Sequence, residues 1–350
     1  MSENAGKNSV RPADFLSPDG RTLHLYGPYL GTPDWKFGAG DHGTAHSHMR
    51  WHPLRREWVV YSAHRQSRTY KPSSDCPFCP KTADGEIPFD DFSVAVLDNR
   101  FSSFQKDAVE PPPLEGLCVG KALGTCEVIV YSADHRASMA SLTRERRELL
   151  VKVWGDRVRS LMALPYVQAV LPFENRGEEA GVTLHHPHGQ IYAFSYIPPV
   201  FENMLQSFRE GASVSMLAGR AESLVSGTDT MSAVVPPFAR FPYEVWIAPK
   251  RFVSAPDGLN ADEVRDCAFL LGDVQARYDK FFGRVCAYVM AVYSAPRGAE
   301  TFFPFHIQYF PLLRTPQKLK FIAGVELGAG SFLVDVLPEE AARSLRSVRV

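Results

Sequence analysis

The sequence predicts an α+β protein made of two tandem halves, each an antiparallel sheet packed with helices. Two observations support this fold class. Short extended segments bounded by turn residues alternate with longer amphipathic segments that have a helical period. The same order of segments then appears a second time, at an offset of 117 to 118 residues. A repeat of this length indicates that the chain contains two copies of one structural unit.

Each copy comprises a strand, a helix and two further strands. In the first copy these segments are predicted at residues 127–135, 142–162, 166–177 and 186–194. In the second copy they are predicted at residues 244–252, 259–282, 286–298 and 305–313. The chain accordingly divides into an extended or partly disordered arm (1–45), an N-terminal half (46–200) and a C-terminal half (201–350).

Histidines distinguish the two copies at the positions where chemistry is expected. The residues that match are Glu127 with Glu244, His188 with His306, and Gln190 with Gln308. The residues that differ are His135, replaced by Phe252, and His186, replaced by Pro304. We therefore expect one working site in the N-terminal half and a structural role for the C-terminal half.

The composition excludes several classes of partner. Of 350 residues, 45% are apolar and 22% charged, and 38 Lys and Arg nearly balance 39 Asp and Glu. No broad basic surface for nucleic acid or membranes is expected. The N-terminus lacks an apolar secretion segment, no uninterrupted apolar run has the length of a membrane span, and the six cysteines are too scattered for a disulfide framework. These features predict a reduced, cytoplasmic protein that acts on small molecules.

A metal site is predicted from the pair Cys76 and Cys79, because a two-residue spacing lets two thiolates bind one tetrahedral ion. Two ordinary core thiols or a redox pair are the alternatives. No second such pair exists, so two further ligands are needed, and His135 and His186 are the candidates. Four protein ligands leave no position for a reactive water. The expected ion is therefore one structural Zn per chain.

A nucleophile is suggested by the segment TLHHPHGQ, residues 183–190. In a strand over 186–194, His186, His188 and Gln190 would point to the same side. Either both imidazoles bind one metal, or one binds the metal while the other reacts. A histidine poised near neutral pH attacks phosphorus well, and a glutamine amide can donate to the phosphoryl oxygens. Satisfied polar residues on a half-exposed strand remain the alternative to a catalytic role.

The segment before this strand, ENRGEEAG at residues 174–181, is a turn-rich loop. Its free backbone N–H groups could bind a phosphate. Residue chemistry alone thus narrows the function to work directed at phosphorus or at a metal.

Several motifs in one order resemble the galactose-1-phosphate uridylyltransferases of the histidine-triad superfamily. They are RWHPLRREWVVYSAHRQSRTYKP, CPFC, VLDNRF, GTCEVIVYSADH, ENRG, GVTLHHPHGQ, HIQYFPLLR and KFIAGVELG. The resemblance extends from about residue 50 to residue 345. It implies two histidine-triad-like halves, only one of which is active, as the repeat also suggests.

The resemblance implies a two-step reaction in which His188 takes UMP from UDP-glucose and passes it to galactose-1-phosphate. Gln190 would bind the phosphoryl oxygens, and His186 would both ligate zinc and orient His188 through its carbonyl. The substrate-binding residues that it implies are Arg65, Arg68, Asn99, Asn175, Thr183, Lys320, Phe321 and Glu326. The last three belong to a segment that, in the family, reaches across a dimer interface. A homodimer with shared active sites is therefore implied.

At several positions the sequence differs from the family pattern, so the family's residue roles cannot be assigned there. Some members have a second metal site, but here Gln308 and Tyr293 stand where two of its histidines would be. Glu202 does not align with the expected acid. We therefore predict that the second metal is absent. Arg100 replaces an acidic residue and Leu184 a polar one. A related transferase or phosphorylase that forms an adenylyl-histidine is the alternative enzyme. A zinc-stabilised nucleotide-binding scaffold is the alternative from a different class.

Overall fold

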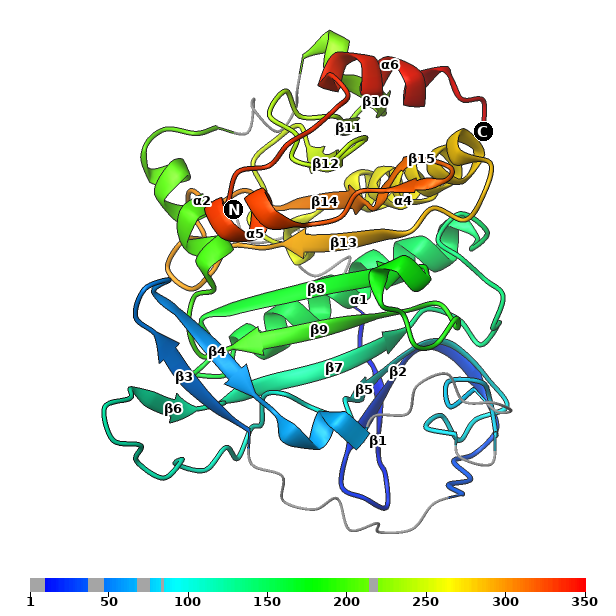
Figure 1. Ribbon diagram of the computed structural model, residues 1–350. Helices are drawn as coiled ribbons and strands as arrows, with labels where there is room; N and C mark the ends of the chain where they lie inside the picture. Colours follow the sequence, from blue (N-terminus) through cyan, green and yellow to red (C-terminus); the bar gives the residue numbers. More distant parts are fainter. Residues whose placement is uncertain (1–9, 37–46, 68–75, 83–84, 214–219) are drawn as a thin grey trace.

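One antiparallel sheet of eleven strands runs through both halves of the computed structural model, which describes residues 10–36, 47–67, 76–82, 85–213 and 220–350 (Figure 1). The order across the sheet is β1-β2-β5-β7-β9-β8-β13-β14-β12-β11-β10. The strands of the N-terminal side are β1 (Ala13–Leu16), β2 (Thr22–Leu30), β5 (Asp91–Asp98), β7 (Gly124–Val130), β8 (Ala169–Arg176) and β9 (His188–Phe194). Those of the C-terminal side are β10 (Leu224–Gly227), β11 (Met231–Val234), β12 (Val245–Pro249), β13 (Tyr288–Tyr293) and β14 (His306–Pro311).

The strand order is symmetric about the contact between β8 and β13. Read outward from this contact, β8, β9, β7, β5 and β2 correspond to β13, β14, β12, β11 and β10. At the contact Phe173 pairs with Ala291, its own equivalent at the offset of 118 residues. The predicted fold class is confirmed, and the structure adds that the sheets of the two halves join edge to edge.

Two long helices cover one face of this sheet. Helices α1 (Arg144–Met162) and α4 (Ala261–Phe282) contact each other and lie behind the sheet in Figure 1. At the start of α4, Asn260 and Glu263 form a capping box, and Gly283 ends the helix at a φ of 62°. Buried residues of both halves, such as Trp154 and Leu271, form one hydrophobic cluster. This shared core fixes the two halves relative to each other.

Smaller elements surround the sheet. A second sheet contains β3 (His48–His52), β4 (Glu57–Tyr61) and β6 (Val119–Lys121), and β15 (Leu313–Thr315) pairs with β16 (Lys318–Leu319). The other helices are α2 (Pro199–Arg209), α5 (Gly324–Ala329) and α6 (Pro338–Ser347). The 3₁₀ turns are η1 (Ala63–Ser67), η2 (Glu178–Ala180), η3 (Ala221–Ser223) and η4 (Pro256–Gly258). Among the described helices, none combines the length and apolarity that crossing a membrane requires.

The described part of the predicted N-terminal arm belongs to the large sheet. Strands β1 and β2 form a hairpin, and β2 pairs with β5. Leu23, Leu25 and Tyr26 of β2 are almost fully buried. This segment packs as an integral edge of the sheet, because its apolar side chains complete the core. The domain boundaries near residues 45 and 200 stay predictions.

Two strand boundaries beside the expected site differ from the sequence-based prediction. Strand β7 ends at Val130, because the chain turns where the amide of Asp134 binds the Ser132 hydroxyl at 3.1 Å. Strand β9 begins at His188, because Pro187 has no N–H to donate to the ladder. His135 and His186 therefore lie outside the strands, on loops that can approach each other.

Candidate metal centre and active site

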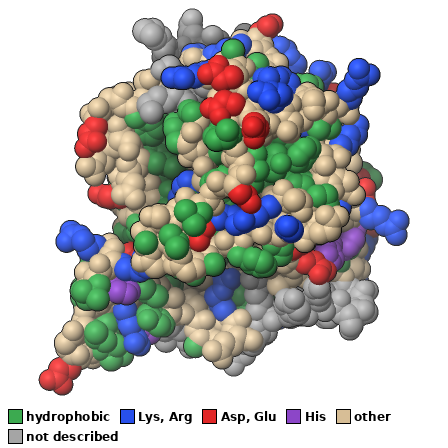
Figure 2. Space-filling model, turned by 45° about the horizontal axis from the view of Figure 1, so that its top comes forward, with side chains coloured by type: hydrophobic (Ala, Val, Ile, Leu, Met, Phe, Trp, Pro, Cys, Tyr) green, Lys and Arg blue, Asp and Glu red, His purple; other side chains and the backbone are tan. Residues whose placement is uncertain are grey.

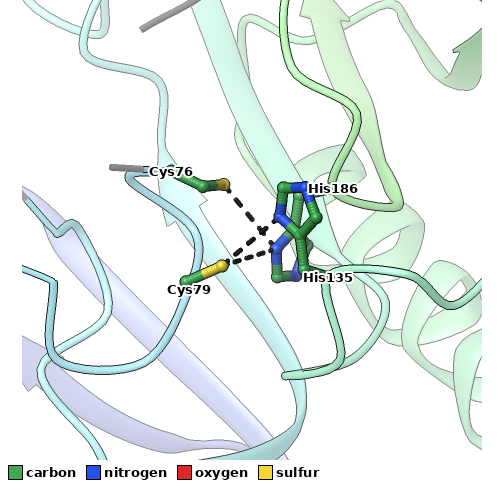
Figure 3. A group of neighbouring side chains, drawn as sticks. All are labelled: Cys76, Cys79, His135 and His186. Carbon is green, nitrogen blue, oxygen red and sulfur yellow. Dashed lines mark hydrogen bonds between the residues drawn. The ribbon is translucent and has the colours of Figure 1, made fainter. Parts of the chain in front are cut away.

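Four side chains from three separate segments meet where β7 ends and β9 begins. Cys76 and Cys79 belong to one tight turn, in which the amide of Cys79 donates to the carbonyl of Cys76 at 3.1 Å. His135 follows β7 and His186 precedes β9 (Figure 3). One ligand atom from each of the four lies within 4.8 Å of all the others. The structure thus brings together the four residues that the sequence predicted.

The distances fit one tetrahedral ion. Nδ1 of His186 lies 3.7 Å from Sγ of Cys76 and 3.5 Å from Sγ of Cys79, and Nδ1 of His135 lies 3.4 Å from Sγ of Cys79. Ligands bound tetrahedrally at ordinary Zn–S and Zn–N lengths are about 3.5 Å apart. All six cysteines are free thiols, so Cys76 and Cys79 are not joined by a disulfide. The cluster can hold a metal ion.

Backbone and burial fix the metal-facing nitrogen of His186. Its Nε2 lies 2.7 Å from the carbonyl oxygen of Ser132, which can only accept a hydrogen bond, so Nε2 carries the hydrogen. Nδ1 is therefore left as the ligand atom. Burial lowers the pKa of His186 to about 4. The imidazole is therefore neutral at neutral pH, which is the form that binds a metal.

His188 faces a different partner. Its Nδ1 donates to the carbonyl oxygen of His186 at 2.7 Å, and the ring of Phe78 packs against it with centroids 5.2 Å apart. An Nδ1–H tautomer leaves the lone pair on Nε2. His188 does not belong to the metal cluster among the described residues. Of the two outcomes considered from the sequence, the geometry favours one histidine that binds the metal and another that can react.

A cavity of about 360 Å³ opens beside His188. Asn175, from the end of β8, lines it together with Arg136. Thr183 lies in the same loop, between the lining residues Val182 and Leu184. The loop predicted to bind phosphate therefore borders the cavity of the reactive histidine. Several of its N–H groups are used internally, for example that of Gly181, which donates to the Glu178 carbonyl at 2.9 Å.

Strand β9 presents Gln190 and Tyr192 on the same side as His188, since side chains alternate along a strand. The amide of Gln190 makes no hydrogen bond with any residue that the structure describes. Arg65 lies over this side and donates to the Phe101 carbonyl at 2.9 Å and to the Tyr192 hydroxyl at 3.3 Å. Its predicted companion Arg68 falls outside the described residues.

Asn99 follows β5 and lines a smaller cavity of about 150 Å³ with Thr125 and Cys126. Its backbone N–H donates to the Cys126 carbonyl at 2.9 Å, and its Oδ1 accepts from the Phe101 amide at 2.9 Å. The Thr125 hydroxyl is buried and has no partner within the described part of the chain. A ligand that enters this cavity can satisfy it.

The predicted residues at the C-terminal end do not reach the cavity of the same chain. Lys320 is buried, and its ammonium group donates to Glu326 and, at 2.9 Å, to the Leu333 carbonyl. Phe321 is 66% exposed. None of Lys320, Phe321 and Glu326 is among the described residues that line the cavity at His188.

Glu174 was not predicted as a site residue. It lies on β8, the strand that pairs with β9, and borders the cavity, and burial raises its pKa to about 7. The hydroxyl of Tyr288 donates to its Oε1 at 3.0 Å, and Gln275 of α4 donates to Tyr288 Oη at 3.2 Å. The ENRG motif contains Glu174, but only the tertiary structure shows this environment, since Gln275 and Tyr288 lie about a hundred residues further along the chain.

The C-terminal half keeps the geometry of the reactive histidine but covers it. Nδ1 of His306 donates to the carbonyl oxygen of Pro304 at 2.9 Å, as His188 does to His186. The Gln308 amide lies 3.0 Å from Nε2 of His306, and the rings of Trp246 and Tyr293 stack on the imidazole. Burial lowers the pKa of His306 to about 4. Its ring is enclosed by the protein, consistent with the predicted structural role of this half. The predicted absence of a second metal stays a prediction.

The sequence matches a known protein family over both halves of the chain. Residues 39–198 match the N-terminal domain of galactose-1-phosphate uridyl transferase, and residues 193–350 match its C-terminal domain. The chain belongs to the galactose-1-phosphate uridylyltransferase family. The predicted identity, a nucleotidyltransferase of galactose metabolism that acts as a UDP-glucose–hexose-1-phosphate uridylyltransferase, is thereby confirmed.

Individual relatives agree. A galactose-1-phosphate uridylyltransferase of Thermotoga maritima is 38% identical over 86% of this chain and 98% of that protein. A solved uridylyltransferase structure has a TM-score of 0.78 at 28% identity, covering 86% of this chain and 97% of that one. An ADP-glucose phosphorylase from Arabidopsis thaliana has a TM-score of 0.67 at 20% identity, over 87% and 99% of the two chains. That last likeness shows the shared fold alone.

Proposed function

We propose that the enzyme transfers UMP from UDP-glucose to galactose-1-phosphate through a covalent uridylyl group on His188. The observation that carries this proposal is the hydrogen bond from Nδ1 of His188 to the carbonyl oxygen of His186. It directs the lone pair of Nε2 away from the backbone, in a residue that borders a cavity of about 360 Å³. A neutral imidazole held in this way is an effective nucleophile towards phosphorus.

In the first step Nε2 of His188 attacks the α-phosphorus of UDP-glucose. A P–N bond forms while the P–O bond to the β-phosphate breaks, and glucose-1-phosphate leaves with the electron pair. The positive charge that develops on the imidazole is shared with the His186 carbonyl through the Nδ1–H. In the second step a phosphate oxygen of galactose-1-phosphate attacks the same phosphorus, and the P–N electrons return to Nε2, which gives UDP-galactose.

Nearby residues supply the binding functions. The Gln190 amide, uncommitted within the described chain, would donate to the phosphoryl oxygens as charge accumulates there. Asn175 and Thr183 would contact the phosphates and Asn99 the nucleoside, because the first two belong to the loops at His188 and the third lines the smaller cavity. Arg65 and Arg68 would bind the sugar phosphate.

The metal cluster would hold one structural Zn, since two thiolates and two imidazoles at tetrahedral spacing suit this ion. When bound, Zn supplies a crosslink between the turn at Cys76–Cys79 and the two loops that carry His135 and His186. Because the His186 carbonyl also holds His188, this crosslink positions the nucleophile.

A homodimer with shared sites would complete the substrate pocket. Phe321, Ile322, Val325 and Leu327 form an exposed apolar strip on and before α5, with exposed fractions of 66%, 47%, 46% and 61%. Such strips on a folded surface mark interfaces. The same segment carries Lys320 and Glu326, which do not line the cavity of their own chain.

The test is to trap the intermediate. The protein is mixed with UDP-glucose labelled in the α-phosphate, quenched in alkali, in which phosphohistidine survives, and mapped by peptide mass. We expect a uridylyl group on the peptide that contains His188, and its discharge by galactose-1-phosphate. A label on another peptide, or an adduct formed only from an ADP-sugar, would overturn the proposal.

A further inference from the structure

The C-terminal half contains a second cavity, of about 400 Å³, that the uridylyl transfer does not use. It lies between α2 and the strands β12 and β14. Trp246 and Gln308, which are cross-strand partners, line it on the sheet side. Asn203 and Ser207 line it from α2. On the face that Figure 2 shows, hydrophobic side chains form patches between charged side chains.

The internal repeat relates this cavity to the active-site face of the N-terminal half. The pair Trp246 and Gln308 lies at the offset of 118 residues from the pair Val128 and Gln190. Equivalent side chains of the two halves lie on the same face of the sheet, because the equivalent helices α1 and α4 cover one common face. The second cavity therefore lies over the C-terminal counterpart of the strand positions at Gln190.

The second cavity and the smaller cavity beside Asn99 lie over equivalent positions of the two halves. The sequence comparison matched Glu244 with Glu127, but the strand register, in which Val128 corresponds to Trp246, shifts this match by one residue. Glu244, which lines the second cavity, is therefore the equivalent of Cys126. Cys126 lines the cavity beside Asn99, to which the proposed function assigns the nucleoside. Both halves thus have a recess over the same position of the sheet.

The lining suits a flat ring that carries an anionic group. The rings of Trp246 and Phe238 meet with centroids 5.4 Å apart at 70°, which makes an aromatic corner. Arg240 lines the same cavity, and its guanidinium lies over the Phe332 ring at 4.8 Å but makes no ion pair or hydrogen bond within the described chain. The carboxylate of Glu244 also lines the cavity, and three donors, Trp246 Nε1 and the amides of Arg240 and Phe241, offset part of its negative charge.

No reaction is expected in this cavity. The imidazole of His306 is 1% exposed, and its Nε2 already has the Gln308 amide as a partner. The Gln308 amide is thereby engaged as well, whereas that of Gln190 remains uncommitted. A ligand in the C-terminal cavity would therefore be bound and released without transfer.

We infer that the C-terminal cavity is a second, non-catalytic site for a nucleoside monophosphate, with the base against Trp246 and Phe238 and the phosphate at Arg240. The inference rests on the proposed function in one respect, since the comparison uses the nucleoside cavity at Asn99. A pocket of about 400 Å³ is of the size that small-molecule ligands occupy.

The experiment uses 5-iodo-UMP, whose halogenated base forms crosslinks with stacked aromatic side chains on near-ultraviolet irradiation. After irradiation of the whole enzyme, labelled peptides are mapped by mass spectrometry. We expect two labelled regions, one in the N-terminal half and one that contains Trp246 or Phe238. Excess UMP should suppress both.

Two blocking variants and a matched control test the site. Asn203→Trp and Ser207→Trp add bulk at exposed positions of α2 that line the cavity, and Gln206→Trp adds it at an exposed position of α2 that does not. We expect each blocking variant to reduce C-terminal labelling at least tenfold, the control to leave it unchanged, and Arg240→Ala to weaken UMP competition at that site at least fivefold. All four should retain uridylyl transfer, which shows that they fold.

Labelling confined to the N-terminal half, or C-terminal labelling that survives both blocking variants, would overturn the inference. Failure of the proposed function looks different. In that case His188 forms no adduct with UDP-glucose, whatever the crosslinking of the C-terminal half.

Discussion

Nδ1 of His188 lies 2.7 Å from the carbonyl oxygen of His186, whose own ring belongs to the metal cluster. The candidate nucleophile and the candidate metal ligand are thus separated by a single residue and joined by a hydrogen bond. The chain uses Pro187 between them, which restricts the backbone and holds the two imidazoles in different directions.

Replacement of His188 by Asn should abolish the uridylyl adduct and lower kcat by about 10³-fold or more, since loss of a nucleophile removes the covalent route. The matched control is His185→Asn, at an exposed histidine three residues away. Stopped-time assays of UDP-galactose formation and intact mass after UDP-glucose addition check both variants. A His188→Asn protein that still accumulates a covalent uridylyl group would contradict the assignment.

Replacement of Gln190 by Ala should lower kcat by about 10²-fold, which is the usual cost of removing one donor to a developing oxyanion. Because this amide makes no hydrogen bond with the described residues, the folded state loses little, and the melting temperature should stay within a few degrees of the parent. The comparison is Gln308→Ala, whose amide is buried against His306. That variant should show the reverse pattern, with a lower melting temperature and a smaller effect on kcat. Equal kinetic effects from both would argue against the role of Gln190.

Replacement of Cys79 by Ser should remove bound zinc and destabilise the protein, because a structural site contributes its binding free energy to folding. Inductively coupled plasma mass spectrometry should give about one Zn per chain in the parent and much less in the variant. The exposed thiol Cys118 offers the control, since Cys118→Ser should keep the metal and the melting temperature. Stoichiometric metal in Cys79→Ser would contradict the ligand set.

Glu174 should make stability fall as the pH rises. Burial raises its pKa in the folded protein to about 7, above its ordinary value of 4.5, so between these pH values the unfolded chain is ionised while the folded protein holds the proton. The stabilisation is complete below about pH 4.5 and is lost as the pH rises through about 7. Glu174→Gln cannot ionise, so urea unfolding should give equal pH dependence below pH 5 and a relative gain for the variant of up to about 3 kcal/mol above pH 7. A constant difference across this range would exclude Glu174 as the titrating group.

Mixing two inactive variants should restore activity if the sites are shared between subunits. A heterodimer of His188→Asn and Phe321→Ala chains has one site with both mutations and one with neither. Random subunit exchange makes half of the dimers hybrid, so about a quarter of the parental sites should be intact. Activity after co-refolding, with size-exclusion chromatography to establish the dimer, checks this. No recovery despite hybrid formation would place Phe321 in the site of its own chain, and a Phe321→Ala protein that is active on its own would place this residue outside any site.

The sequence by itself determined the α+β class and the repeat, and it identified the candidate ligands of the metal cluster. The repeat was visible because strand and helix periodicity recur at one offset, and periodicity is a local property of the chain. The cluster could be predicted because the two-residue spacing of Cys76 and Cys79 is typical of a metal site, and His135 and His186 were plausible donors to complete it. The family motifs then pointed to His188 and Gln190.

Only the tertiary structure decided which of the two adjacent imidazoles faces the cysteines and which faces the cavity. Alternation along a strand predicted that His186 and His188 point to the same side of the sheet. In the structure β9 begins only at His188, and the preceding loop directs the His186 ring to the Ser132 carbonyl. Likewise, no local signal joins Glu174 to Tyr288 or Trp246 to Gln308. These pairs arise from packing between segments far apart in the chain, and such contacts depend on the whole fold because each is formed only when the sheet and its helices close around it.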